Sequence, residues 1–146
     1  MTVPMKLIYS SASADDAFRE QLSAHLHSLV QQGWLSEWHE QLIPAGTEVA
    51  QERRRAWRSA DIILLLLSAD YFLSDAYDDQ EMQQALERHH LGQVLIIPVL
   101  LRPCEWQSAT VGHLQCLPRN GIAVTLWEDR DAALLSVAQE LHRLIF

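Results

Sequence analysis

The stretch Asp61–Ser68 reads DIILLLLS and holds an unbroken aliphatic run, Ile62–Leu67. This run has the length of a strand and falls well short of the roughly 20 apolar residues that cross a bilayer. Because every position is apolar, rather than every second one, we expect a strand that is buried on both faces. Such strands are typical of parallel sheets covered by helices, so the stretch predicts an α/β fold.

Four further apolar runs of strand length occur along the chain: Met5–Tyr9, Leu35–Trp38, Gln93–Leu101 and Ile122–Leu126. The segments between them and after them have helical spacing or capping residues: Ser13–Gly33, Glu48–Arg58, Ser74–His90 and Asp131–Phe146. Strands that alternate with helices predict a flavodoxin-like, five-stranded parallel sheet of order 2-1-3-4-5 with helices on both faces. In such folds ligands bind beyond the carboxyl ends of the strands.

Length and charge limit the function classes. The chain has 146 residues, so we expect a single domain over residues 1–146. Lys and Arg total 11 and Asp and Glu total 19, which gives a net charge of −8. This charge disfavours binding to nucleic acid phosphates or to an anionic membrane. Cys104 and Cys116 make no disulfide framework, and we expect no signal peptide, so a cytoplasmic location is predicted.

Several common sites are not indicated by the sequence. It contains neither GxGxxG nor GxxxxGK[ST] for phosphate binding, and no GxSxG nucleophile motif. The seven His and two Cys do not have the spacing of metal ligands, so no metal is expected.

Glu81 is the candidate that the fold itself indicates. Ser68 ends the most apolar strand, and Ser74–Glu81 (SDAYDDQE) leads into the next helix. A carboxylate there lies near the carboxyl edge of the sheet, where a ligand cleft is expected. Acidic residues in a first helical turn also complement the helix dipole without any catalytic role. Both interpretations stay open on spacing alone.

Five stretches, in this order and at this spacing, also carry a family resemblance: Ser10 followed by SADDAFREQL, GWLSEWHEQLIPAGTE, SADIILLLLSADYFLSDAYDDQEMQQALER, VLIIPVLLRPCEW and GIAVTLWEDRDAALLSVAQEL. Together they resemble a bacterial TIR (Toll/interleukin-1 receptor) domain over nearly the whole chain. The resemblance implies the same fold as the strand pattern. It also implies an activity, because many members of that family hydrolyse or cyclise NAD+.

The resemblance gives Glu81 a catalytic role, since family members use a glutamate in the helix after the third strand. They break the bond between ribose and nicotinamide. Nicotinamide leaves as a neutral molecule, so no general acid is needed, and an anion stabilises the oxocarbenium-like ribose that remains. A glutamate of ordinary pKa, about 4.3, is ionised at neutral pH. NAD+ is then a substrate, and no cofactor is expected.

Further substrate-binding positions follow from the same resemblance. Ser10 and Ser11 follow the first strand, where the family lines its cleft. Pro44 and Gly46 match the BB loop, which in the family gates the site and joins neighbouring subunits. Tyr77 lies four residues before Glu81, so on a helix it would share that face and stack on nicotinamide or adenine. The alternatives are capping and turn formation for the serines and the loop, and packing for Tyr77.

The chain also departs from the family pattern. Val49 stands where relatives often have an aromatic residue, and Ser11 stands where they usually have tyrosine. Arg53–Arg55 place three cations on the helix after the BB loop. These arginines suit an assembly interface or substrate phosphates, and equally a solvated helix face.

Two functions therefore remain open. The first is an NAD+-consuming effector domain of bacterial immune defence that self-association activates, together with a sensor or regulatory partner. The second is a non-catalytic module that signals by TIR–TIR contact. Among other flavodoxin-like proteins, a phosphoacceptor receiver would need Asp where Ser68 ends the third strand. A nucleoside deoxyribosyltransferase would share the glycosidic chemistry but act on a different substrate.

Overall fold

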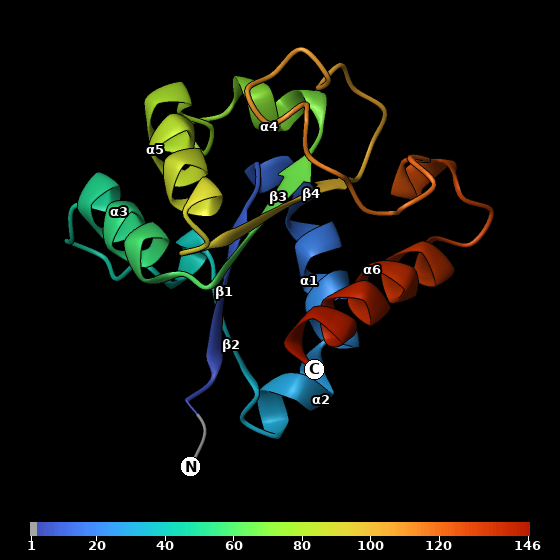
Figure 1. Cartoon of the computed structure of the whole chain (residues 1–146), viewed down its shortest axis with the longest axis horizontal. Helices are drawn as coiled ribbons and strands as arrows, with labels where there is room; N and C mark the ends of the chain where they lie inside the picture. The colour runs from blue at the N-terminus through green and yellow to red at the C-terminus, as the bar shows by residue number, and fades with distance from the viewer. Residues whose placement is uncertain (1–2) are drawn as a thin grey trace.

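The computed structural model describes residues 3–146, in which a parallel sheet lies between two layers of helices (Figure 1). Its four strands are β1 (Met5–Ser10), β2 (Leu35–Trp38), β3 (Ile62–Leu67) and β4 (Leu95–Leu100). They are ordered β2-β1-β3-β4, and every pairing is parallel. The α/β fold, the parallel sheet and the order of its first four strands are thus confirmed.

β3 is the centre of the sheet, as its composition predicts. It pairs with β1 from Ile62 to Leu65 and with β4 along its whole length, and all six of its residues are buried. Successive strand residues point to opposite faces. Ile63, Leu65 and Leu67 accordingly join one apolar cluster, whereas the three residues that alternate with them join the other.

The helices divide between these two clusters. One face of the sheet is covered by α3 (Val49–Ser59), α4 (Ala69–Leu73) and α5 (Asp79–His90), and the other by α1 (Asp16–His25), α2 (His27–Gln31) and α6 (Arg130–Ile145) (Figure 1). Each contributes buried apolar side chains, and those of α6, such as Leu134, Ala138 and Leu141, form a stripe along one helical face. Within residues 3–146, no helix combines the length and the apolar character that crossing a bilayer requires.

The prediction of a fifth strand at Ile122–Leu126 is wrong. Val124–Leu126 form a 3-10 helix, η3, and only one hydrogen bond, from Thr125 N to Leu101 O (3.0 Å), joins this segment to the end of β4. The free edge of β4 is occupied instead by Leu117, which bonds to Pro98 and Leu100 at 2.8 Å each. The apolar run also buries only Ala123 and Val124, so it lacks the two-sided burial that a strand in this sheet would have.

The segment between β3 and α5 contains a short helix that the sequence pattern does not indicate, α4, whose cap is Ser68. The chain then turns, and α5 begins at Asp79, within the predicted start Ser74–Asp79, and continues to His90 as predicted. Asp78 caps α5 by accepting a hydrogen bond from Glu81 N at 3.1 Å. This cap satisfies one of the free N–H groups of the helix and fixes the first turn, on which Glu81 lies.

Candidate functional site

Glu81 lies in a cavity formed by α3 and the start of α5. The amino end of α5 is level with the carboxyl end of β3, the edge at which the sequence predicts a site (Figure 1). The cavity has a volume of about 200 Å³. We call it the Glu81 cavity, and its lining residues are Ala50, Arg53, Arg54, Asp78, Gln80, Glu81 and Gln84.

The Glu81 carboxylate is half-buried and only partly compensated. Its Oε1 atom is buried and has no hydrogen-bond partner among residues 3–146. Burial raises the pKa of this carboxyl above its ordinary value, and the charge of Arg53 opposes the shift. An acceptor left without a donor costs folding free energy. Such an oxygen is suited to accept a hydrogen bond from a ligand that enters the cavity.

Arg53 connects the Glu81 cavity to the segment after β2. Its Nε donates a hydrogen bond to Glu40 in the short 3-10 helix η2 (Glu40–Leu42), and its side chain is 12% exposed. This ion pair raises the pKa of Arg53 against the desolvation of its guanidinium, and the charge of Glu81 acts in the same direction. Arg53 therefore stays cationic next to both carboxylates.

The two candidate serines at the end of β1 lie in different surroundings. Ser10 is buried, and its hydroxyl lies 2.8 Å from the hydroxyl of Tyr71. Ser11 lines a second cavity of about 170 Å³, whose wall also includes Glu40. The structure therefore does not bring either serine into the Glu81 cavity, and the ion pair of Glu40 with Arg53 lies at the boundary between the two cavities.

Pro44 and Gly46 are exposed in the loop that joins η2 to α3. The loop is a tight turn in which Thr47 N and Thr47 Oγ1 both bond to Pro44 O, at 3.3 and 2.7 Å. Gly46 has a φ of +88°, a conformation that favours glycine. Neither Pro44 nor Gly46 lines the Glu81 cavity. The loop that holds Pro44 and Gly46 follows η2, and η2 contacts the lining of the Glu81 cavity through the Glu40–Arg53 ion pair.

The prediction that Tyr77 shares a helical face with Glu81 is wrong, because Tyr77 precedes α5 and lies in the turn before it. Its ring packs edge-on against Tyr71 and Phe72, with centroids 5.7 and 5.1 Å apart. Its hydroxyl donates a hydrogen bond to Asp79 Oδ1 at 2.7 Å. Tyr77 thus contributes to the packing beneath the start of α5 and does not line the Glu81 cavity.

Sequence reasoning missed two polar residues on the same helix. Gln84 lines the Glu81 cavity, and Arg88 lies in a smaller hollow that Glu81 also lines. They follow Glu81 by three and seven positions, which is the spacing of one helical face. That spacing is visible in the sequence and would have indicated both residues.

A buried polar network organises the carboxyl edge of the sheet next to this site. Asp15 is fully buried and accepts hydrogen bonds from Ser68 Oγ at 2.5 Å and from Arg102 Nε at 3.1 Å. Arg102 also pairs with Asp70 of α4. The network ties the ends of β3 and β4 to the turn after β1 and so holds the frame from which α4 and α5 continue.

Comparison with known proteins agrees with this architecture. The solved structure of the TIR domain of the Toll-related receptor TRR-2 from Hydra magnipapillata superposes with a TM-score of 0.64. That match covers 95% of this chain and 96% of the other, at 21% identity, and it concerns the fold alone.

A sequence relative is closer. Uncharacterized protein y4lF of Sinorhizobium fredii (strain NBRC 101917 / NGR234) is 42% identical over 136 residues. These residues are 93% of this chain and 42% of that protein, so the chain spans about two fifths of the relative's length. The sequence profile described as TIR domain matches residues 7–142. The chain belongs to the TIR domain family.

Proposed function

We propose that this domain cleaves the ribose–nicotinamide bond of NAD+, with Glu81 as the catalytic residue. The observation that carries the proposal is the buried Oε1 of Glu81, which has no hydrogen-bond partner among residues 3–146 and lies in a cavity that two arginines also line. Membership of the TIR family supports it, since the resemblance of the third strand and the following helix gives Glu81 the position of the family's glutamate.

The chemistry requires little from the protein. When the C1′–N bond breaks, its electron pair goes to the nicotinamide ring, which leaves neutral, and positive charge develops on the ribose. The Glu81 carboxylate accepts a hydrogen bond from a ribose hydroxyl and stabilises that charge at short range. Water then adds to C1′ and releases a proton, giving ADP-ribose. In a cyclase, a nitrogen of the adenine adds instead.

The size of the cavity bears on how the substrate is held. Sites for small molecules of drug size usually have roughly 300–1,000 Å³, whereas the Glu81 cavity has about 200 Å³. A dinucleotide bound at Glu81 therefore extends beyond this cavity. The proposal that self-association activates the enzyme rests on the family resemblance and not on this volume.

The test is the rate of NAD+ loss at increasing protein concentration, for wild type and Glu81→Gln. Glu87→Gln is the matched control, because Glu87 is an exposed glutamate on the same helix. We expect wild type and the control to show a rate that rises faster than protein concentration. Glu81→Gln should lose about 10²- to 10³-fold, as when one preorganised electrostatic group is removed. Equal rates in wild type and Glu81→Gln, both folded, would refute the role of Glu81.

A second candidate function is a non-catalytic interaction module. The observation in its favour is the exposed apolar surface around the loop between η2 and α3, where Leu42 is 54% and Val49 is 51% exposed. Such residues suit contact with another protein. This function predicts concentration-dependent association without loss of NAD+, and an association that is identical in wild type and Glu81→Gln.

A further inference from the structure

Positive charge is concentrated on α3 although the chain is acidic overall. Four of the 11 Lys and Arg residues, Arg53, Arg54, Arg55 and Arg58, occur within six positions of this helix. Arg53 pairs with Glu40 and Arg55 with Glu52. Within residues 3–146, no carboxylate lies at ion-pair distance from Arg54 or Arg58, so their charges are uncompensated by direct contacts.

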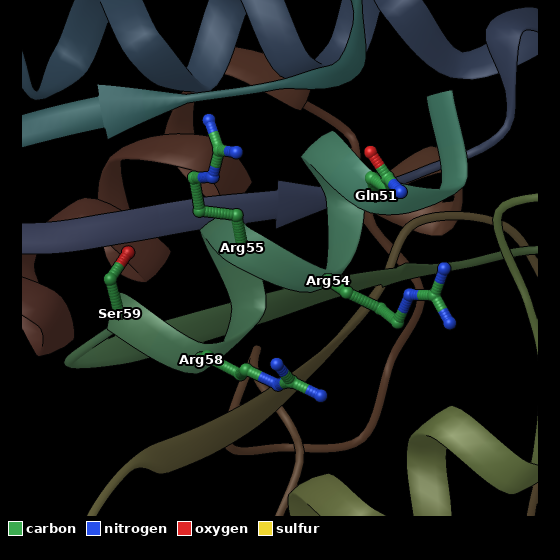
Figure 2. A pocket seen from close by; sticks show the side chains of 5 residues that line it. All are labelled: Gln51, Arg54, Arg55, Arg58 and Ser59. Atoms are coloured by element: carbon green, nitrogen blue, oxygen red, sulfur yellow. The ribbon is translucent and has the colours of Figure 1, made fainter. Parts of the chain in front are cut away.

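Arg54 and Arg58 also lie together on α3. They are four positions apart, and Figure 2 shows their side chains extending to the same side of the helix while Arg55 points the other way. These residues, with Gln51 and Ser59, line an open hollow of about 570 Å³, which we call the arginine groove. Two guanidinium groups on residues four positions apart on one helix can bind the oxygens of one anion.

A smaller hollow joins the arginine groove to the Glu81 cavity. Its volume is about 90 Å³. It shares Arg54 and Arg58 with the arginine groove, and Arg54, Glu81 and Gln84 with the Glu81 cavity. The three hollows are therefore neighbours along α3, and the two smaller ones lie between α3 and α5.

The α5 side of the small hollow carries a third cation. Arg88 lines the small hollow, and its Nη1 donates a hydrogen bond to the main-chain oxygen of Trp57 at 2.8 Å. This bond orients the guanidinium toward α3 and leaves its other donors without an acceptor among residues 3–146. Like Arg54 and Arg58, Arg88 has no carboxylate partner within residues 3–146.

We infer that Arg54, Arg58 and Arg88 bind the diphosphate of a dinucleotide whose nicotinamide ribose lies on Glu81. The inference rests on the proposed function, which puts that ribose in the Glu81 cavity. In a dinucleotide the diphosphate follows the ribose after a single methylene group, and the small hollow follows the Glu81 cavity directly. Guanidinium groups match phosphate oxygens in geometry and in charge, and they balance the carboxylate that the same ligand must approach.

The inference explains two further features. The open arginine groove is large enough for the adenosine half that the Glu81 cavity cannot contain. Cations without partners repel one another, and a bound diphosphate of opposite charge would relieve that repulsion.

The test is a binding measurement that needs no turnover. ADP-ribose is titrated into the 146-residue chain at low ionic strength, and its Kd is measured by calorimetry for four proteins. These are wild type, Glu81→Gln, which removes the ribose contact and keeps the arginines, and the double variants Arg54→Gln/Arg58→Gln and Arg119→Gln/Arg143→Gln. The last is the matched control, because it removes the same charge from exposed arginines that do not face the small hollow.

We expect ADP-ribose to bind wild type and Arg119→Gln/Arg143→Gln with similar affinity, and to bind Arg54→Gln/Arg58→Gln at least about tenfold more weakly. Inorganic pyrophosphate should compete for the same site. An equal loss in both double variants would show diffuse charge attraction and overturn the inference. So would equal affinity in all four proteins, or no binding to wild type. If the arginine-dependent binding is present but wild type consumes no NAD+ at any concentration, the proposed function fails while the anion site stands.

Discussion

Arg53 forms an ion pair with Glu40 and lines the same cavity as Glu81. One guanidinium group thus lies next to two carboxylates, one in η2, before the loop to α3, and one on α5, the helix that carries Glu81. Its charge lowers the pKa of Glu81, against the larger effect of burial. Arg53 is therefore a positioning residue for the ionisation of Glu81.

Replacing Arg53 should move the ionisation of Glu81 to higher pH. In Arg53→Gln the charge that favours the carboxylate is gone, and Glu40, no longer neutralised, raises the pKa of Glu81 further. We expect the acidic limb of the kcat/KM profile to shift upward, with little change at its alkaline plateau. A carbon-13 NMR titration of the Glu81 carboxyl measures the same shift without turnover. Arg55→Gln is the control, and a shift of equal size there would exclude a specific effect of Arg53.

Glu81 should also cost the protein stability at neutral pH. Its pKa is raised in the folded state, so the folded protein binds the proton more tightly than the unfolded chain does. Stability therefore falls as pH rises through this window, and the cost is fully present once Glu81 is ionised. We expect Glu81→Gln to unfold at higher urea concentration than wild type at pH 7.

The difference between Glu81→Gln and wild type should vanish below the ordinary glutamate pKa of about 4.3, where the carboxyl is neutral in both states. Glu87→Gln, at an exposed position, should match wild type throughout. If Glu81→Gln were instead less stable than wild type at pH 7, the carboxylate would have a partner in the folded protein, and the argument from an unpartnered oxygen would be lost.

How far the sequence predicts this fold depends on what each residue contacts. Ile62–Leu67 are buried on both faces, and their continuous apolar run predicts this burial directly. Ile122–Leu126 look similar, but whether they extend the sheet depends on the edge of β4, which Leu117 occupies. The sequence of Ile122–Leu126 does not show that Leu117 pairs with β4 in its place, and for this reason the prediction of a fifth strand is wrong.

In the candidate site, too, some features follow from local sequence and others depend on contacts between distant residues. Glu81 and its place on the first turn of α5 follow from strand order and capping residues. The contact of Arg53 with Glu40 joins residues 13 positions apart through a loop, and no periodicity indicates it. α5 begins only at Asp79, so Tyr77 lies before the helix that it was expected to share with Glu81. Which residues share a helical face depends on where the helix begins, and sequence patterns give that position only to within a few residues.

The pair of Arg102 and Asp15 should be the strongest ionic contribution to stability. Asp15 is fully buried, and Arg102 Nη2 lies 2.9 Å from its Oδ1 atom. Arg102→Met leaves a buried carboxylate with only the Ser68 hydroxyl, so we expect a loss of about 3 kcal/mol in the free energy of unfolding. The control is Arg119→Met, which breaks an exposed pair with Glu140. It should cost less than about 1 kcal/mol. Equal losses in urea denaturation would contradict the role of the buried network.

The hydrogen bond between Ser10 and Tyr71 separates a structural role of Ser10 from a substrate-binding one. Tyr71 is fully buried, Ser10 is 4% exposed, and their hydroxyls are 2.8 Å apart. Removing either hydroxyl leaves the other without a partner, so Tyr71→Phe and Ser10→Ala should each cost about 1–3 kcal/mol. The double variant should cost clearly less than the sum, since both groups then leave together. A structural serine predicts that Ser10→Ala leaves the KM for NAD+ unchanged in protein that remains folded. An increase in KM in Ser10→Ala, without one in Tyr71→Phe, would instead show that the hydroxyl of Ser10 turns toward the substrate during catalysis.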